Sequence, residues 1–213
     1  MAEKIVLVGG GGHCKSVLNT IYKLGIYTDV VITDSALAPG SMILNAKVVG
    51  DDSTLPDLLK QGYSNAIITV GSIKSTDVRR KIYKELEQLG FGFPTIIDPS
   101  ASVSEYAEIG EGVFVGSNAS VNAEAQIGAF AIINTSAIIE HESSIGRFSH
   151  IAVGATVCGN VLVGDDVFVG AGATLIQGVT IGDCAIIGAG SLVNKDVYPN
   201  SMVCGVPARG CNK

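Results

Sequence analysis

The sequence predicts an α/β plus all-β protein. A small Rossmann-like parallel α/β domain is expected over residues 1–94 and a parallel β-helix over residues 95–213. Two observations carry this prediction. Before residue 90, short apolar runs alternate with amphipathic helical stretches, as they do in βαβ units. From Ile97 to Val193 every sixth residue is aliphatic, seventeen times in succession. A period of six fits neither an α-helix nor an alternating strand, and it is typical of hexapeptide β-helices.

The first ninety residues contain the signals of alternating strands and helices. Strands are expected at residues 4–8, 29–34 and 66–70, with a short one at 46–50, and helices at 13–24, 53–61 and 75–89. Gly25 and Gly90 end the first and last helices, since glycine tolerates the left-handed conformation found there. Ser53 or Thr54 is the expected N-cap of the middle helix. The alternation predicts a small parallel sheet.

A run of four glycines, residues 9–12, separates the first strand from the first helix. Neither the ATPase-loop pattern nor the dinucleotide fingerprint is complete, because Cys14 stands where each requires glycine. A strand, a glycine loop and a helix N-terminus still present N–H groups to an anion. Asp34, at the end of the second strand, is placed to accept hydrogen bonds from a ribose or a base. A glycine loop used only for tight packing is the alternative.

The period-six ladder also predicts the shape of the β-helix. The fourth residue after each aliphatic is Ala, Ser or Val, as expected where the tube is tight. The residue after each aliphatic is Gly, Asn or Asp at twelve positions, which predicts a left-handed backbone at these corners. Strands this short close most simply into three sides. One coil then takes eighteen residues, and residues i and i+18 lie one above the other.

Two of the three histidines fall within the ladder, and His141 is the stronger candidate for chemistry. It lies two residues after the inward Ile139, between two glutamates, and Gly159 is one coil further along. A histidine flanked by carboxylates beside an approachable N–H suits a general base next to an oxyanion donor. A solvated corner histidine is the alternative. His141 and His150 are nine residues apart rather than a whole number of coils, so no metal site is expected.

Composition excludes some partners and locations. The net charge of −6 argues against nucleic acid, whose binding usually needs a basic face. The chain starts without the pattern of a signal peptide, and no apolar run is long enough to span a membrane. The five cysteines form no C-x-x-C pair and are expected to be reduced thiols, which favours a cytoplasmic protein. Residues 202–210 leave the period and are expected to cap the tube.

Four segments together resemble a known family. They are the GGGGH loop, N-T-S-x-x-I-E-H-E at residues 134–142, F-S-H-I-A-V-G-A at 148–155, and the tail G-V-P-A-R at 205–209. The tail and the hexapeptides resemble left-handed β-helix acyltransferases. The full set resembles the group of bacterial sialic acid O-acetyltransferases and UDP-N-acetylbacillosamine N-acetyltransferases, over nearly the whole chain.

This resemblance implies a homotrimer that binds acetyl-CoA in clefts between neighbouring β-helices, with the N-terminal domain holding the nucleotide of a sugar substrate. It implies that His141 is the general base and that Glu142 orients it. The implied substrate-binding residues are Gly10, Gly12, His13, Asp34, Gly71 and Asn134, and the implied cofactor-binding residues are His150, Gly159 and Arg209. Cys14 departs from the family pattern and is expected to narrow the phosphate pocket.

The predicted function is acetyl-CoA-dependent N-acetylation of the C4 amine of a nucleotide-linked amino sugar. In this reaction the amine attacks the thioester directly and His141 accepts its proton. The first alternative is O-acetylation of a sialic acid or a related sugar in the same fold. The second is a non-catalytic scaffold or ligand sensor that retains the β-helix.

Overall fold

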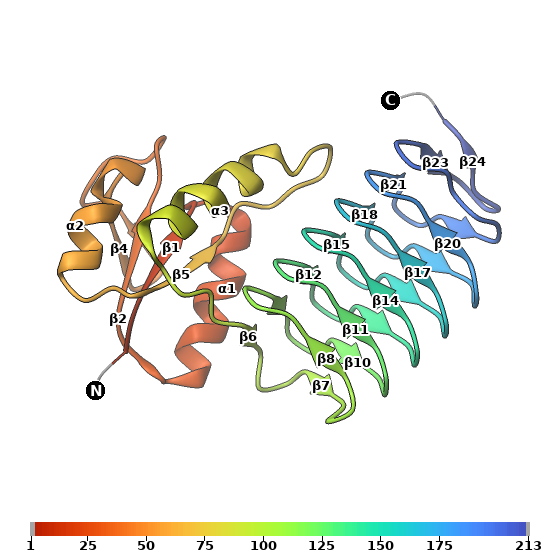
Figure 1. Ribbon diagram of the computed structural model, residues 1–213, viewed down its shortest axis with the longest axis horizontal. Coiled ribbons are helices and arrows are strands. Elements are labelled where there is room, and N and C mark those ends of the chain that lie inside the picture. The colour runs from red at the N-terminus through yellow and green to blue at the C-terminus, as the bar shows by residue number, and fades with distance from the viewer. Residues whose placement is uncertain (1–2, 212–213) are drawn as a thin grey trace. The chain divides into compact units, whose positions relative to one another are not determined.

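The computed structural model describes residues 3–211, which divide into two compact units. The first unit contains the chain up to residue 71 together with residues 77–99. The second contains residues 72–76 together with the chain from residue 100 onward, and its coils are the stacked rungs of Figure 1. The chain therefore leaves the first unit at Gly71, contributes five residues to the second, and returns before its long helix.

The first unit is built on a five-stranded sheet in the order β3-β4-β2-β1-β5. Its strands are β1 (Glu3–Val8), β2 (Tyr27–Thr33), β3 (Met42–Ile43), β4 (Ala46–Gly50) and β5 (Asn65–Ile68). All neighbours pair in parallel except β3, an unpredicted strand that runs antiparallel to β4. Strand β1 has β2 on one side and β5 on the other, so the order of the strands in the sheet reverses at β1. Parallel sheets of this kind bind ligands beyond the carboxyl ends of the strands at such a point.

Helices α1 (Gly12–Leu24), α2 (Leu55–Lys60) and α3 (Asp77–Leu89) belong to the same unit, which ends with β6 (Ile96–Ile97). Gly25 ends α1 with φ of 64°, as predicted. Thr54, one of the two predicted caps, is the N-cap residue of α2, but its side chain makes no capping hydrogen bond. Asp51 accepts the Ser53 N–H at 3.0 Å and starts a 3₁₀ turn, Asp52–Thr54, that leads into α2. No helix within residues 3–211 is long and apolar enough to cross a membrane.

The second unit is a β-helix whose regular strands are two residues long and form three parallel sheets. One sheet contains β7 (Ser102–Val103), β10 (Ser120–Val121), β13 (Ile138–Ile139), β16 (Thr156–Val157), β19 (Thr174–Leu175) and β22 (Leu192–Val193). The next contains β8 (Glu108–Ile109), β11 (Gln126–Ile127), β14 (Ser144–Ile145), β17 (Leu162–Val163) and β20 (Thr180–Ile181). The third includes β9 (Phe114–Val115), β12 (Ile132–Ile133), β15 (His150–Ile151), β18 (Phe168–Val169) and β21 (Ile186–Ile187), extended by β23 (Met202–Cys204) and β24 (Arg209–Gly210).

The register confirms the predicted coil of eighteen residues. Val121 pairs with Val103 on one side and with Ile139 on the other, and the other two sheets repeat this spacing. The inward aliphatics stack on one another and are nearly all buried, as Ile139 and Ile151 are. Each buried aliphatic of this size contributes on the order of 1.5–3 kcal/mol before the entropy of ordering is subtracted.

The explanation predicted for the corner glycines is wrong. The left-handed backbone occurs at the third residue after each aliphatic from Ile109 to Ile187, for example Glu124 with φ of 61° and Glu142 with φ of 60°. Glycine is needed directly after the aliphatic for a different reason. A Cβ on Gly128 would lie 2.8 Å from the backbone nitrogen of Arg147 in the next coil. These glycines allow successive coils to approach closely, and they do not have to adopt a positive φ.

The C-terminal strands close one end of the β-helix, as predicted. β23 pairs in parallel with β21 and in antiparallel with β24. Leu192 of the last regular coil donates its N–H to Gly205 and accepts the Ala208 N–H at 2.7 Å. The hairpin therefore satisfies backbone groups that the final coil would otherwise expose.

Candidate active site

His141 lies at the corner between β13 and β14, and hydrogen bonds hold its backbone on both sides. The Asn160 N–H donates to the His141 carbonyl at 3.0 Å, and the Glu142 N–H donates to the Ala123 carbonyl of the preceding coil at 3.1 Å. The His141 Nδ1 lies 3.0 Å from Glu142 Oε2, and both side chains are more than half exposed. A carboxylate at Nδ1 favours the tautomer with hydrogen on that nitrogen, which leaves the Nε2 lone pair available as a base.

The imidazole of His141 covers Gly159 of the next coil. A Cβ on Gly159 would lie 2.7 Å from His141 Cε1 and 2.8 Å from Nε2. The Gly159 carbonyl already accepts the Gly178 N–H at 3.1 Å. Since residue 159 has no side chain, the ring can rest directly against the backbone. This is the juxtaposition expected from the eighteen-residue spacing.

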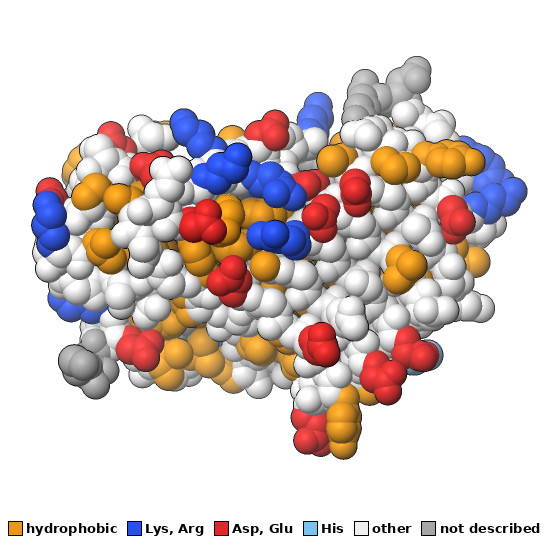
Figure 2. Space-filling model, in the orientation of Figure 1, with side chains coloured by type: hydrophobic (Ala, Val, Ile, Leu, Met, Phe, Trp, Pro, Cys, Tyr) orange, Lys and Arg blue, Asp and Glu red, His pale blue; other side chains and the backbone are white. Residues whose placement is uncertain are grey.

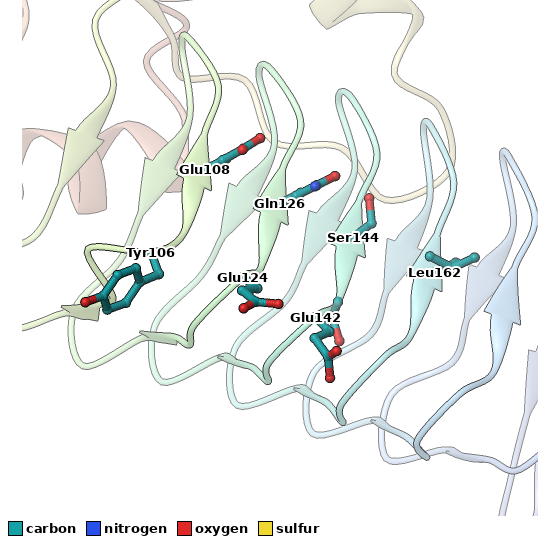
Figure 3. Close-up of a pocket in the computed structure, with 8 residues that line it drawn as sticks. Tyr106, Glu108, Glu124, Gln126, Glu142, Ser144 and Leu162 are labelled. Atoms are coloured by element: carbon teal, nitrogen blue, oxygen red, sulfur yellow. The ribbon is translucent and has the colours of Figure 1, made fainter.

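A cavity of about 440 Å³ opens beside this corner, on the face formed by β8, β11, β14 and β17. Figure 3 shows Glu124 and Glu142 at equivalent corners of successive coils, with Tyr106 one coil further back. Glu108, Gln126, Ser144 and Leu162 line the cavity from the strands. Three carboxylates face this hollow, and Figure 2 shows acidic side chains gathered along the corresponding rim. The cavity is therefore suited to a cationic or strongly hydrogen-bonding group.

Asn134 and His150 form a second cluster in the β-helix. Asn134 Nδ2 lies 3.2 Å from His150 Nε2, and Asn134 Oδ1 accepts the Thr135 N–H at 2.8 Å. On its other side, His150 Nδ1 lies 3.0 Å from the Ser72 carbonyl. The imidazole is 9% exposed and packs edge-on against Phe168. Both of its nitrogens thus face protein groups.

In the first unit, Asp34 organises the glycine loop. Its Oδ2 accepts the Gly10 N–H at 2.7 Å, and its Oδ1 accepts the N–H groups of Ala36 and Leu37 at 2.8 and 3.1 Å. Burial raises the pKa of Asp34, but these three hydrogen bonds outweigh burial and hold the pKa below its ordinary value. The carboxylate that was predicted to contact a ribose or a base is thus already bound to backbone.

The rest of the glycine loop stays accessible. Gly11 is the N-cap of α1 and makes no side-chain capping bond, and a Cβ on Gly11 or Gly12 would meet nothing within 4 Å. His13 follows, half-buried, and a Cβ on Gly71 would lie 3.9 Å from His13 Cβ. A second cavity of about 310 Å³ lies at this end of the sheet and includes Asp34. The helix N-terminus suits an anionic ligand such as a nucleotide phosphate, whereas the cavity itself is lined by Asp34, Asp52 and Glu85 together with Lys81.

Cys14 does not narrow this pocket, so that prediction is wrong. Its side chain is fully buried in the core of the first unit and hydrogen-bonds the side chain of Thr69. Burial raises the pKa of the Cys14 thiol to about 11. The side chain of the third residue of α1 points towards the sheet rather than towards the ligand side of the loop.

A third cavity, of about 250 Å³, lies at the C-terminal end of the β-helix and carries positive charge. Lys195 and Arg209 line it together with Asp196, which leaves one positive charge in excess. Lys195 occupies the corner that His141 occupies three coils earlier, about 14 Å away along the axis at 4.8 Å a coil. Arg209 is exposed on β24, and its guanidinium donates to the Ala208 carbonyl at 2.7 Å.

The structure therefore brings His141, Glu142 and Gly159 together at one corner and Asn134 with His150 in a separate cluster. Gly10, Gly12, His13, Asp34 and Gly71 lie together at the glycine loop, and Arg209 lies at the opposite end of the β-helix from the first coil. Sequence reasoning missed Glu124, Lys195 and Ser72. The eighteen-residue spacing from Glu142 and His141 points to the first two, whereas no repeat points to Ser72. Among residues 3–211, no three His, Cys, Asp or Glu side chains are grouped to hold a metal ion.

The fold and this corner define a hexapeptide-repeat transferase. Residues 4–86 match the family model described as the PglD N-terminal domain, and residues 160–195 match the bacterial transferase hexapeptide model with six repeats. Comparison with curated proteins gives no significant match.

Solved structures resemble the whole chain. A mutant of perosamine N-acetyltransferase from Caulobacter crescentus, in complex with CoA and GDP-perosamine, is 35% identical with a TM-score of 0.93, covering 100% of this chain and 99% of that one. The acetyltransferase domain of PglB from Neisseria gonorrhoeae, in complex with acetyl coenzyme A, is 31% identical with a TM-score of 0.91, covering 99% and 100%. WeeI from Acinetobacter baumannii, at 24% identity and a TM-score of 0.88, shares the fold and covers 99% and 100%.

The chain therefore belongs to the left-handed β-helix sugar acetyltransferases that carry a PglD-type N-terminal domain. The predicted fold class and family resemblance are both confirmed.

Proposed function

We propose that the protein transfers the acetyl group of acetyl-CoA to the C4 amine of a nucleotide-linked amino sugar, with His141 as the general base. The observation that carries the role of His141 is its geometry. Nδ1 is held by Glu142 at 3.0 Å, and the opposite edge of the ring lies over the Gly159 backbone. The related structures contain CoA with GDP-perosamine in one case and acetyl coenzyme A in another, which supports the two substrates.

In the proposed reaction the amine nitrogen attacks the thioester carbon, and His141 Nε2 takes the proton that the nitrogen releases. Glu142 orients the imidazole and stabilises its positive charge once it is protonated. The backbone N–H of Gly159 donates to the oxyanion of the tetrahedral intermediate. The carbon–sulfur bond then breaks, the amide remains, and the proton held by His141 neutralises the CoA thiolate. Starting from the neutral amine, every proton and electron pair is accounted for; an acceptor that arrives as an ammonium ion first releases one proton to solvent.

The acidic cavity supports an amine rather than a hydroxyl acceptor. Glu108, Glu124 and Glu142 face one hollow beside the proposed base. An amino sugar is largely an ammonium ion before it reacts, and carboxylates attract it. A sugar hydroxyl carries no charge and gains nothing from this potential. For this reason we place N-acetylation ahead of O-acetylation of a sialic acid.

The other predicted residues are assigned by charge and position. The accessible N–H groups at Gly11 and Gly12 suit the nucleotide phosphates, with His13 and Gly71 beside them. Asn134 remains the residue proposed to contact the sugar. Lys195 and Arg209 suit the phosphates of CoA, because both line a cavity at the C-terminal end of the β-helix and Lys195 lies three coils beyond His141 on the same edge. We further propose that the protein acts as a homotrimer in the cytoplasm, in keeping with cysteines that form no disulfide among the described residues.

The test is a substrate panel with acetyl-CoA as donor. GDP- and UDP-linked 4-amino sugars, free sialic acid and CMP-sialic acid are each incubated with the enzyme. Release of the CoA thiol and addition of an acetyl group to the sugar are followed together. We expect turnover with a nucleotide-linked 4-amino sugar and a loss on the order of 10² or more in His141→Ala. Near-normal turnover in that variant excludes the general-base role.

The same panel separates the alternatives. Acetylation of a sialic acid and of no amino sugar supports the O-acetyltransferase. A scaffold or sensor transfers no acetyl group to any acceptor, and calorimetry with acetyl-CoA then shows whether the donor is bound at all.

A further inference from the structure

The segment between β5 and α3 is held on the β-helix by two side chains. Ser72–Thr76 groups with the β-helix unit, although the residues on either side of it belong to the first unit. The Ser72 carbonyl lies 3.0 Å from His150 Nδ1, and the Thr76 hydroxyl donates to Asp166. Ser72 and Thr76 are both buried, while Ile73 between them is exposed. The segment is thus fixed at both ends and open in the middle.

The hydrogen bonds around His150 define its tautomer. Asn134 Oδ1 accepts the Thr135 N–H, so the amide nitrogen of Asn134 must be the group that faces His150 Nε2. Nε2 is therefore the acceptor, and the ring hydrogen is on Nδ1. Nδ1 faces a carbonyl, which can only accept. The donors and acceptors from Thr135 to Ser72 are consistent when His150 Nδ1 carries the hydrogen and donates to the Ser72 carbonyl.

The residues directly before Ser72 pack against the glycine loop. Gly71, the preceding residue, lies close to His13, since a Cβ on Gly71 would be 3.9 Å from the His13 Cβ. Thr69 donates its hydroxyl to the Gly9 carbonyl at 2.6 Å, and a Cβ on Gly9 would lie 2.5 Å from Val70. The chain from Thr69 to Gly71 is therefore packed on the loop that presents N–H groups to an anion. The residue after Gly71 is Ser72, whose carbonyl lies against His150 Nδ1.

We propose that His150 is a positioning residue that fixes Ser72 and so sets the Gly71 side of the nucleotide loop. In this role it controls affinity for the nucleotide sugar and makes no contribution to acetyl-CoA binding. The identity of the ligand rests on the proposed function. The restraint on residues 72–76 is independent of it, because it follows from the hydrogen bonds of Ser72 and Thr76. It differs from the role that the family resemblance implies, because both imidazole nitrogens are already engaged by Asn134 and Ser72.

Three variants separate these roles. His150→Phe keeps a flat ring against Phe168 and removes both hydrogen bonds. His150→Asn places an amide N–H near the position of Nδ1 and keeps the donor to Ser72. His150→Gln places its amide nearer to Nε2 and keeps the contact with Asn134 instead. Circular dichroism and the melting temperature establish that each variant is folded.

Steady-state kinetics with both substrates varied, together with calorimetry of acetyl-CoA, test the proposal. We expect His150→Phe to raise KM for the nucleotide sugar about tenfold, which corresponds to the loss of the buried hydrogen bond to Ser72, with the Kd of acetyl-CoA changed less than about twofold. His150→Asn should recover most of this loss and His150→Gln little of it. A weaker Kd for acetyl-CoA with an unchanged nucleotide-sugar KM overturns the proposal, and so does an unchanged value of both.

Hydrogen exchange gives a readout that needs no catalysis. In His150→Phe the backbone amides of residues 73–76 should exchange at least about tenfold faster than in the wild-type protein, while the coils around Ile139 keep their protection. If no acceptor is ever acetylated, the proposed function fails, but this exchange result still supports the restraint. Unchanged exchange in residues 73–76 refutes the restraint even if the enzyme is active.

Discussion

The imidazole of His141 occupies the space that a side chain at Gly159 would fill, with Cε1 2.7 Å from where a Cβ would be. The corner itself accepts a Cβ, because Ala123 stands at the equivalent position one coil before His141. Gly159→Ala should therefore leave the fold intact and push the exposed imidazole away. We expect kcat to fall on the order of tenfold to a hundredfold, as misplacement of a catalytic group does, with little change in melting temperature.

A double-mutant cycle checks the cause of that fall. In a His141→Ala background the space beside Gly159 is empty, and Gly159→Ala should have almost no further effect on the residual rate. A full additional loss in this background would contradict the steric explanation and would place the effect in the backbone of Gly159 itself.

Glu142 and Glu124 carry the same charge at equivalent corners of adjacent coils, but only Glu142 touches the imidazole. In the proposed reaction the charge of Glu142 stabilises protonated His141, and Glu142→Gln removes it, so kcat should fall about tenfold or more. Glu124→Gln removes one attractive charge from an exposed hollow. It should raise KM for the amino sugar by at most about fivefold and leave kcat unchanged. Steady-state kinetics of both variants at one ionic strength make the comparison. Equal effects on kcat would show that Glu142 acts only as a surface charge.

The β-helix was predictable from the sequence because its constraint is local and repeated. Each coil places an aliphatic such as Ile139 inside, so the register follows from arithmetic, and the same arithmetic sets His141 beside Gly159. The reason for the corner glycines was not predictable. It depends on how closely Gly128 approaches the next coil, a distance that no residue pattern encodes.

The hydrogen bond between His150 and Ser72 joins residues 78 positions apart, one inside the repeat and one outside it. No periodicity relates them, so the sequence could not reveal it. The role of Asp34 is a similar case. The end of a strand predicts where its carboxylate lies, but whether ligand or backbone N–H groups reach it depends on how residues 35–37 turn.

Asp34 should make stability depend on acid pH. Its lowered pKa means that the ionised carboxylate stabilises the folded state above its ordinary pKa near 4, and that this contribution disappears as the pH falls through the lowered value. Asp34→Ala removes three hydrogen bonds to a charged group and should destabilise the protein by about 2 kcal/mol at pH 7. The difference from wild type should shrink below pH 4, as followed by urea unfolding at several pH values.

Asp57→Ala is the matched control for this series. Asp57 is an exposed carboxylate that pairs with Lys60 on the same helix, and its loss should cost less than about 0.5 kcal/mol. A destabilisation by Asp34→Ala that persists unchanged at pH 3 would mean that the charge of Asp34 is not what holds the loop.

Cys14 should be inert in the folded protein despite its place beside the glycine loop. Burial raises the pKa of its thiol to about 11, the negative charge of Asp34 adds to this rise, and the Thr69 hydrogen bond offsets only part of it. At pH 8 its thiolate fraction is about a hundredfold below that of a thiol with pKa 9, and the side chain is also inaccessible. Iodoacetamide should therefore label the exposed Cys184 and Cys204 but not Cys14, as peptide mass spectrometry of the native and urea-unfolded protein would show.

The same burial predicts what Cys14→Gly does. If Cys14 narrowed the phosphate pocket, glycine would widen it and tighten nucleotide binding. In the structure the side chain packs under the sheet, so the change leaves a cavity and adds a glycine to α1. We expect a loss of stability on the order of 2 kcal/mol, with the Kd of the nucleotide measured by calorimetry within about twofold of wild type. A tighter Kd with unchanged stability would mean that the thiol faces the ligand after all.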